Sequence, residues 1–285
     1  MGWRWFQLFP PRGQCNFSPV NSFSNILLDH IERSNSRLCV GLDIDADRIS
    51  HPSSPTLDDL KEYVHKVIDA TLDSAAAYKV NFAFYERYGA EGYRWLEEVA
   101  RQIDCRRLTI ADAKRGDIAN SAKHYAEAIL GQMGFDAVTV NPYMGRDAIE
   151  PFLSRADKGA FVLCVTSNDG ATDLQLQRTG DGFIYERVVS LVSELNQLDN
   201  CGLVVGATRS GTISDVRRTA GDIPFLIPGI GVQGGDLEAS VRAGNEGGVA
   251  LINVSRAIIY AGDQSEVAIR KAAEDYCTRI NAALR

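Results

Sequence analysis

Between Leu38 and Arg285, short apolar runs alternate with longer amphipathic stretches, and this alternation leaves very few possible folds. Strands that alternate with helical segments form parallel sheets, because each crossover brings the chain back to the same edge. Eight such units in about 250 residues are the usual size of a closed (β/α)₈ or TIM barrel. The sequence therefore predicts an α/β protein with this fold, and an open doubly wound sheet is the structural alternative. The runs predicted to be strands are 38 to 43, 77 to 84, 108 to 113, 137 to 141, 160 to 166, 202 to 207, 225 to 229 and 249 to 254.

The stretches between these runs carry the apolar periodicity of helices that cover a sheet. A further amphipathic segment, 21 to 34, is predicted to be a helix that closes the bottom of the barrel. Residues 1 to 20 are expected to form a flexible N-terminal extension. No low-complexity linker divides the remainder, so residues 21 to 285 are expected to form a single barrel domain. The predicted helices are 56 to 76, 91 to 103, 117 to 132, 146 to 155, 183 to 198, 210 to 219, 234 to 243 and 266 to 283.

Composition narrows the classes of partner. Thirty Lys and Arg against 37 Asp and Glu give a formal net charge of −7, which repels polyanions and argues against a nucleic-acid partner. The apolar runs are shorter than the ~20 residues that span a bilayer, so no membrane segment is expected. Widely scattered cysteines without a C-x-x-C pair are typical of reduced core thiols in a cytoplasmic protein. These cysteines are Cys15, Cys39, Cys105, Cys164, Cys201 and Cys277.

Charged residues gather where the predicted third strand ends. Asp112 and Lys114 are two apart in LTIADAKRGD, so strand alternation directs both side chains to one face. Lys79 lies in the middle of the neighbouring strand, where a buried ammonium needs a carboxylate, and Asp112 is the obvious partner. Taken alone, Asp117 also fits a helix cap and Lys79 a snorkelling edge residue. Their concentration at strand ends favours function, because barrel enzymes carry their active sites there.

The run D-A-K-R-G-D, residues 112 to 117, resembles the D-x-K-x-x-D motif of the orotidine 5′-monophosphate decarboxylase suprafamily. The segments AKRGDI and VTVNPYMG resemble the bacterial subtype of that decarboxylase family. The resemblance covers residues 38 to 262. It implies an alternating charge network of Lys79, Asp112, Lys114 and Asp117.

The same resemblance implies a set of substrate-binding residues. Asp43 and Lys79 would hold ribose hydroxyls, and Ser167 in VTSNDG would contact the pyrimidine. Gln233 and Arg256 would contact the phosphate. In this family the residues that correspond to Asp117 and Ser121 come from the partner subunit, so a homodimer is implied.

A glycine-rich loop suits the phosphate. Gly229, Gly231 and Gly234 let backbone amides approach an anion at the start of a helix, whose dipole favours negative charge. Arg256, just past the eighth strand, adds a fork of donors. The loop also satisfies G-x-G-x-x-G, but a dinucleotide fingerprint belongs in a first βα unit with an acidic residue about 20 positions later. Phosphate without a dinucleotide fits better.

Metal and phosphotransfer motifs are less well supported. The run DIDAD, residues 43 to 47, begins like an EF-hand loop, but Arg48 and Ser54 stand where Gly and Glu are needed. The same run resembles an aspartyl phosphotransferase, a reading that leaves the cluster around Lys114 unexplained. The histidines have no paired spacing that would suit zinc or a catalytic triad. We therefore expect no metal and no organic cofactor.

The resemblance implies decarboxylation of orotidine 5′-monophosphate to uridine 5′-monophosphate and CO₂ in a homodimer. Loss of CO₂ leaves a carbanion, so the site must supply preorganised charge and a proton. Lys114 is the expected proton donor, and Asp112 is expected to lie near the leaving carboxylate. Two alternatives stay open. One is an Mg²⁺-dependent sugar-phosphate decarboxylase or synthase of the same suprafamily, and the other is a non-catalytic phosphate-binding barrel.

Overall fold

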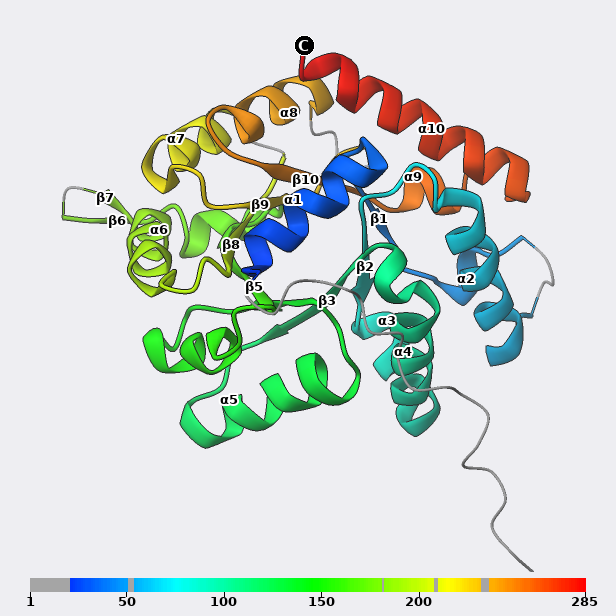
Figure 1. Cartoon of the computed structure of the whole chain (residues 1–285), viewed down its shortest axis with the longest axis horizontal. Coiled ribbons are helices and arrows are strands. Elements are labelled where there is room, and N and C mark those ends of the chain that lie inside the picture. Colours follow the sequence, from blue (N-terminus) through cyan, green and yellow to red (C-terminus); the bar gives the residue numbers. More distant parts are fainter. Residues whose placement is uncertain (1–20, 51–53, 181, 208–209, 232–235) are drawn as a thin grey trace, which may run out of the picture.

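The computed structural model describes residues 21–50, 54–180, 182–207, 210–231 and 236–285. Within these residues, eight parallel strands close into a barrel in the order β1-β10-β9-β8-β5-β4-β3-β2, with helices around it (Figure 1). The predicted (β/α)₈ barrel is confirmed, and the open sheet is wrong. The strands are β1 (Leu38–Gly41), β2 (Ala77–Asn81), β3 (Leu108–Arg115), β4 (Ala137–Val140), β5 (Gly159–Val165), β8 (Cys201–Val205), β9 (Phe225–Ile227) and β10 (Ala250–Val254).

The helices outside the barrel bury one face against it, as their periodicity predicts. Helix α2 begins with a capping box, in which the Thr56 side chain accepts from Asp59 N–H and the Asp59 carboxylate accepts from Thr56 N–H. The α-helices are α1 (Phe23–Ser34), α2 (Leu57–Thr71), α3 (Ala83–Glu86), α4 (Gly89–Ile103), α5 (Ala119–Ala126), α6 (Ile184–Leu195), α7 (Ser210–Ala220), α8 (Leu237–Asn245), α9 (Arg256–Ile259) and α10 (Glu266–Ala283).

Short elements fill several connections. A small antiparallel hairpin, β6 (Arg178–Thr179) with β7 (Gly182–Phe183), lies between β5 and α6. A π-helical segment, η3 (Glu127–Gln132), continues α5. The 3₁₀ helices are η1 (Ala46–Arg48), η2 (Asp104–Arg106), η4 (Arg146–Ala148), η5 (Glu150–Leu153) and η6 (Asp169–Asp173).

Helix α1 closes the amino-terminal end of the barrel, as predicted. Its apolar face joins a core cluster with residues at the starts of the strands, including Ala77, Leu108 and Phe161. Phe23 is fully buried and meets Phe161 edge to face, with ring centroids 5.8 Å apart. A Cβ at Gly159 would lie 2.4 Å from the Phe23 ring, so the glycine makes room for it. The bottom of the barrel is thereby sealed, and its open end is the opposite one.

Three local predictions are wrong. The helix expected over 146 to 155 is replaced by η4 and η5, because Pro151 lacks an N–H and disfavours helical backbone at the residue before it. The helix expected from Asp117 begins at Ala119, with Ile118 as its N-cap. The cysteines were expected to be reduced, yet Cys105 is disulfide-bonded; Cys39, Cys164, Cys201 and Cys277 are free thiols.

Other expectations concern residues that are not described. The N-terminal extension, residues 1 to 20, and Cys15 lie outside the described residues. In the described part of the chain, no helix combines the length and apolar character needed to cross a membrane.

Candidate active site

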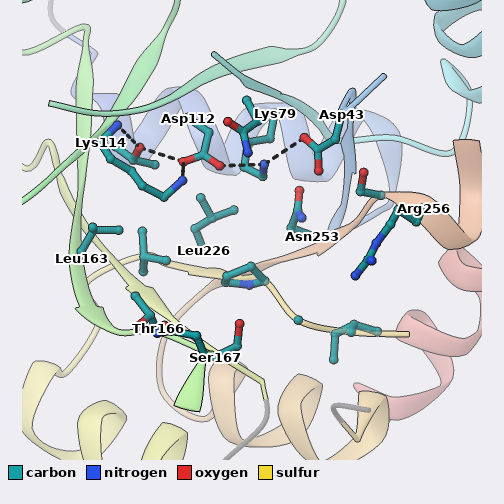
Figure 2. Close-up of a pocket in the computed structure, with 18 of the residues that line it drawn as sticks. Asp43, Lys79, Asp112, Lys114, Leu163, Thr166, Ser167, Leu226, Asn253 and Arg256 are labelled. Carbon is teal, nitrogen blue, oxygen red and sulfur yellow. Dashed lines mark hydrogen bonds and ion pairs between the residues drawn. The ribbon is translucent and has the colours of Figure 1, made fainter. Parts of the chain in front are cut away.

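A cavity of about 320 Å³ opens at the carboxyl-terminal ends of the barrel strands. Charged and polar side chains from β2, β3 and the segment after β1 line one side, and apolar side chains from β5, β8 and β9 line another (Figure 2). The apolar lining includes Leu163, Val204, Leu226 and Pro228. The cavity therefore lies where the sequence predicts the site, at the strand ends that lead into the βα loops.

Four charged side chains form a chain of alternating sign along this cavity (Figure 2). Lys79 Nζ lies 3.6 Å from Asp43 Oδ1 and 3.0 Å from Asp112 Oδ2. Lys114 Nζ donates to Asp112 Oδ1 at 2.6 Å. Strand register explains the arrangement, because Gly41 pairs with Lys79 and Asn81 pairs with Asp112. Asp112 is therefore shared by two ammonium groups, and Lys79 by two carboxylates.

Burial and the attraction between neighbouring charges shift the pKa values of Lys79 and Asp112 in opposite directions. Burial alone would lower the pKa of Lys79, but the charges of Asp112 and Asp43 outweigh it and raise that pKa above its usual range. Burial alone would raise the pKa of Asp112, but Lys79 and Lys114 together hold it well below its usual value. Lys79 and Asp112 are therefore charged across the physiological pH range.

Lys114 differs from the other members of the network in exposure. Its side chain is 48% exposed, whereas those of Lys79 and Asp112 are 5% and 10% exposed. The Lys114 ammonium is thus held by one buried carboxylate and still faces the open cavity. The Lys114 ammonium can therefore contact a bound molecule and keep its hydrogen bond to Asp112.

The opposite end of the cavity carries Arg256, the first residue of α9 (Figure 2). Ser255 precedes it and donates its hydroxyl to Gly41 O at 3.0 Å, which ties the end of β10 to β1. Gly229 lines the cavity with φ +100°, and Gly231 follows with φ +86°. Both conformations favour glycine. The predicted residues Gln233 and Gly234 lie outside the described residues.

The remaining predicted residues separate into two groups. Ser167, after β5, lines the cavity next to Thr166 and Asn168. Asp117 and Ser121 are not among the residues that line the cavity of this chain. The Asp117 carboxylate accepts from Ile118 N–H at 2.8 Å, and Ser121 is exposed on α5.

Among the polar residues of the cavity that sequence reasoning missed are Asn81, Thr139 and Asn253. Asn253, on β10, is 6% exposed, and its Oδ1 has no hydrogen-bond partner among the described residues. Asn81 follows Lys79 by two positions on β2, so alternation directs it to the same face. Each of the three is a polar residue inside or at the end of an apolar run, and this pattern could have indicated a position that lines the cavity.

The arrangement is suited to anionic ligands. One end offers an accessible ammonium beside a carboxylate and the other a guanidinium beside a glycine-rich turn, while apolar side chains such as Leu163 and Leu226 line another side of the same cavity. Within the described part of the chain, no group of three or more His, Cys, Asp or Glu side chains is arranged to hold a metal ion.

The closed parallel barrel and the charged cavity at its carboxyl-terminal mouth define a TIM-barrel enzyme. Residues 36–271 match the model of the orotidine 5′-phosphate decarboxylase / HUMPS family. The chain belongs to this family, and the identification from its sequence motifs is confirmed.

Relatives and solved structures agree with this assignment. Orotidine 5′-phosphate decarboxylase of Dehalococcoides mccartyi (strain CBDB1) is 44% identical over 257 residues, which cover 87% of this chain and 93% of the relative. The structure of Leishmania donovani OMP decarboxylase has a TM-score of 0.81 and 41% identity, covering 92% of this chain and 99% of that one. Leishmania donovani UMP synthase has a TM-score of 0.83 and 42% identity; the match covers 93% of this chain and 57% of that one.

Proposed function

We propose that the chain is a cytoplasmic enzyme that decarboxylates orotidine 5′-monophosphate to uridine 5′-monophosphate and CO₂. The observation that carries the proposal is the ion-pair chain Asp43–Lys79–Asp112–Lys114 at the cavity mouth, in a chain 44% identical to a named orotidine 5′-phosphate decarboxylase. Its cavity of about 320 Å³ has the size range of a small-molecule site.

Lys114 is the proton donor of the proposed reaction. When the bond between the ring and the carboxylate breaks, its electron pair stays on the ring carbon and CO₂ leaves. A positive charge fixed beside that carbon stabilises the developing carbanion, and a proton from Lys114 Nζ completes the product. The hydrogen bond of 2.6 Å to Asp112 supports this role, because it fixes the ammonium before the substrate arrives.

Asp112 lies near the leaving carboxylate in this proposal. Two unit charges ~4 Å apart repel by about 4 kcal/mol at an effective dielectric of 20, and the departure of CO₂ relieves that repulsion. The buried carboxylate keeps its charge between Lys79 and Lys114, so the repulsion is present when the substrate is bound. Asp43 and Lys79, farther along the cavity, bind the ribose hydroxyls.

The phosphate binds at the Arg256 end of the cavity. A guanidinium donates to phosphate oxygens in a fixed fork, and glycines with positive φ allow backbone amides to approach closely. Gln233 and Gly234 take part from the same loop, and Ser167 contacts the pyrimidine. Binding energy from the phosphate then orients the ring against Lys114.

We further propose a homodimer in which residues 21 to 285 of each subunit form one barrel domain, and Asp117 and Ser121 serve the partner's cavity. Their position away from the cavity of their own chain supports this. Exposed apolar side chains lie near Asp117, because Ile118 follows it and Tyr143 and Met144 come just after Asn141, whose N–H donates to Arg115 O; the three are 51%, 77% and 56% exposed. A surface of this kind is typical of an interface.

An ultraviolet assay tests the activity. The full chain is mixed with orotidine 5′-monophosphate, with and without a chelator, and loss of the substrate absorbance is followed. We expect chelator-resistant turnover, and Lys114→Ala should abolish it while uridine 5′-monophosphate still binds. Activity that requires Mg²⁺ on a sugar phosphate would favour the other branch of the suprafamily. Binding of uridine 5′-monophosphate without any turnover would favour a non-catalytic barrel.

A further inference from the structure

Thr139, on β4, connects two charged residues of β3 through its hydroxyl group. Thr139 Oγ1 donates to Asp112 Oδ1 at 3.0 Å and accepts from the backbone N–H of Lys114, also at 3.0 Å. The side chain is 1% exposed and lines the cavity. A single buried hydroxyl therefore contacts the carboxylate of one residue and the backbone of the other.

The contact lies where the pairing of β3 with β4 is irregular. Ala111 pairs with Val138, but the next pair is Arg115 with Val140, so β3 carries extra residues at this point. Lys114, among them, has φ +47°, a left-handed conformation that residues other than glycine rarely adopt. Its N–H meets the Thr139 side chain instead of a backbone carbonyl of β4. The hydroxyl thus stabilises the unusual backbone that turns Lys114 toward the cavity.

The carboxylate of Asp112 is oriented by the same hydroxyl. Asp112 Oδ1 accepts from both Thr139 and Lys114 Nζ, while Oδ2 accepts from Lys79 Nζ. Without the Thr139 donor, the partly exposed Lys114 is the one partner that Oδ1 keeps among the described residues. Preorganised charge stabilises a transition state only when its geometry is fixed within about 0.5 Å.

We propose that Thr139 is a positioning residue for the decarboxylation, acting through Lys114 and Asp112. The inference rests on the proposed function. The only proton of the hydroxyl is engaged by Asp112, so Thr139 acts on these two residues and not as a donor to the substrate. Substrate binding at the phosphate end does not depend on it.

Matched variants test the role of the hydroxyl. Thr139→Val keeps the shape of the side chain and removes the hydroxyl, Thr139→Ala removes it with a smaller side chain, and Thr139→Ser retains it. Thr109→Val is the control, because Thr109, a buried residue of β3, makes the same kind of hydrogen bonds with Asp136, just before β4 and outside the cavity. For each variant, thermal unfolding, kcat, KM and the affinity for uridine 5′-monophosphate are measured.

We expect Thr139→Val and Thr139→Ala to lower kcat by about 10- to 100-fold, the value of one hydrogen bond to a charged group. KM and the affinity for uridine 5′-monophosphate should stay within about threefold, and Thr139→Ser should recover kcat to within about threefold. If the valine variant does not fold, the alanine and serine variants give the same comparison. Thr109→Val should keep the wild-type kcat at temperatures where it is folded.

The two proposals fail in different ways. If the wild type is active and Thr139→Val or Thr139→Ala has an unchanged kcat, the proposed role of Thr139 is overturned and the proposed function is not. The same holds if serine and valine lower kcat equally, or if the loss appears only in KM. A folded wild type that does not decarboxylate orotidine 5′-monophosphate overturns the proposed function and this role with it.

Discussion

Asp112 Oδ2 lies 3.0 Å from Lys79 Nζ, in an ion pair whose side chains are only 10% and 5% exposed. Two charges removed from water are stable only when paired and hydrogen-bonded. Asp112 meets this condition with three donors, from Lys79, Lys114 and Thr139. The pair links β2 to β3 at the mouth of the barrel, so it belongs to the fold as well as to the candidate site.

Replacing Asp112 by asparagine should therefore affect both stability and activity. The change removes the charge shared by two ammonium groups and leaves Lys79 with Asp43 at 3.6 Å as its remaining carboxylate. We expect the free energy of unfolding to fall by about 3 kcal/mol, as when one partner of a buried pair is removed, and kcat/KM by more than about 100-fold. Urea unfolding and the ultraviolet assay measure the two effects. Wild-type values for both would contradict the role of this carboxylate.

Arg217 is another buried charge, and backbone carbonyl oxygens stabilise it where Lys79 has carboxylates. Its side chain is 4% exposed and donates to the carbonyl oxygens of Gly221, Ile223, Gly244 and Val249. The guanidinium carbon also lies 3.5 Å from the centre of the Phe225 ring. Burial lowers the pKa of Arg217 to about 10, partly offset by the charge of Asp222. The residue joins the C-terminal ends of α7 and α8 to the starts of β9 and β10.

Arg217→Met should lower the free energy of unfolding by about 3 to 5 kcal/mol, because buried carbonyl groups lose their donor. The neighbouring Arg218, whose side chain is 74% exposed and paired with Asp215, is the control. Arg218→Met should change stability by less than about 0.5 kcal/mol. Denaturant unfolding of the two variants and the wild type gives the comparison, and equal stabilities of the two variants would refute the argument.

The architecture and the charged strand ends could be predicted from the sequence because both depend on local periodicity. Eight alternations require a parallel sheet, and the spacing of Asp112 and Lys114 places both on one face. The ion pair between Lys79 and Asp112 was predicted from the cost of burying a lone ammonium, and the structure contains it. These inferences need only the order of residue types along the chain.

Other features depend on contacts between distant segments and could not be predicted in the same way. The left-handed backbone of Lys114 is stabilised by the hydroxyl of Thr139 on β4, 25 residues away. The residues next to Lys114 in the sequence do not indicate this conformation. The ion pair of Asp43 with Lys79 depends on the register of β1 against β2. In contrast, the break of the helix expected over 146 to 155 has a local cause in the sequence, because Pro151 lies within that segment.

His30 makes stability depend on pH. It lies on α1, is 4% exposed, and has a lowered pKa, mainly because burial disfavours the charged form; Asp136 and Asp29 oppose this shift. A histidine with a lowered pKa in the folded state takes up its proton more readily when unfolded. The folded state should therefore lose stability as pH falls below about 6.5, the usual pKa of a histidine side chain.

Substituting His30 by glutamine should make the free energy of unfolding less sensitive to pH between about 7.5 and 5.5, since the substituted side chain does not titrate. Urea unfolding at both pH values measures this difference for the wild type and the variant. His65→Gln, which removes an exposed histidine, is the control. An equally steep loss of stability in the wild type and the His30 variant would show that other groups cause it.

Arg256 provides the test of the phosphate end. Figure 2 places it across the cavity from Lys114, so its removal leaves the ion-pair network intact. Arg256→Ala should lower kcat/KM for orotidine 5′-monophosphate by about 100-fold or more, because charge-assisted bonds to the phosphate are lost. Orotidine, which lacks the phosphate, should react with both proteins at rates within about threefold of each other, since the arginine has no group to bind. An equal loss on both substrates would mean that Arg256 acts on the ring end or on the fold, and an unchanged kcat/KM would remove it from the site.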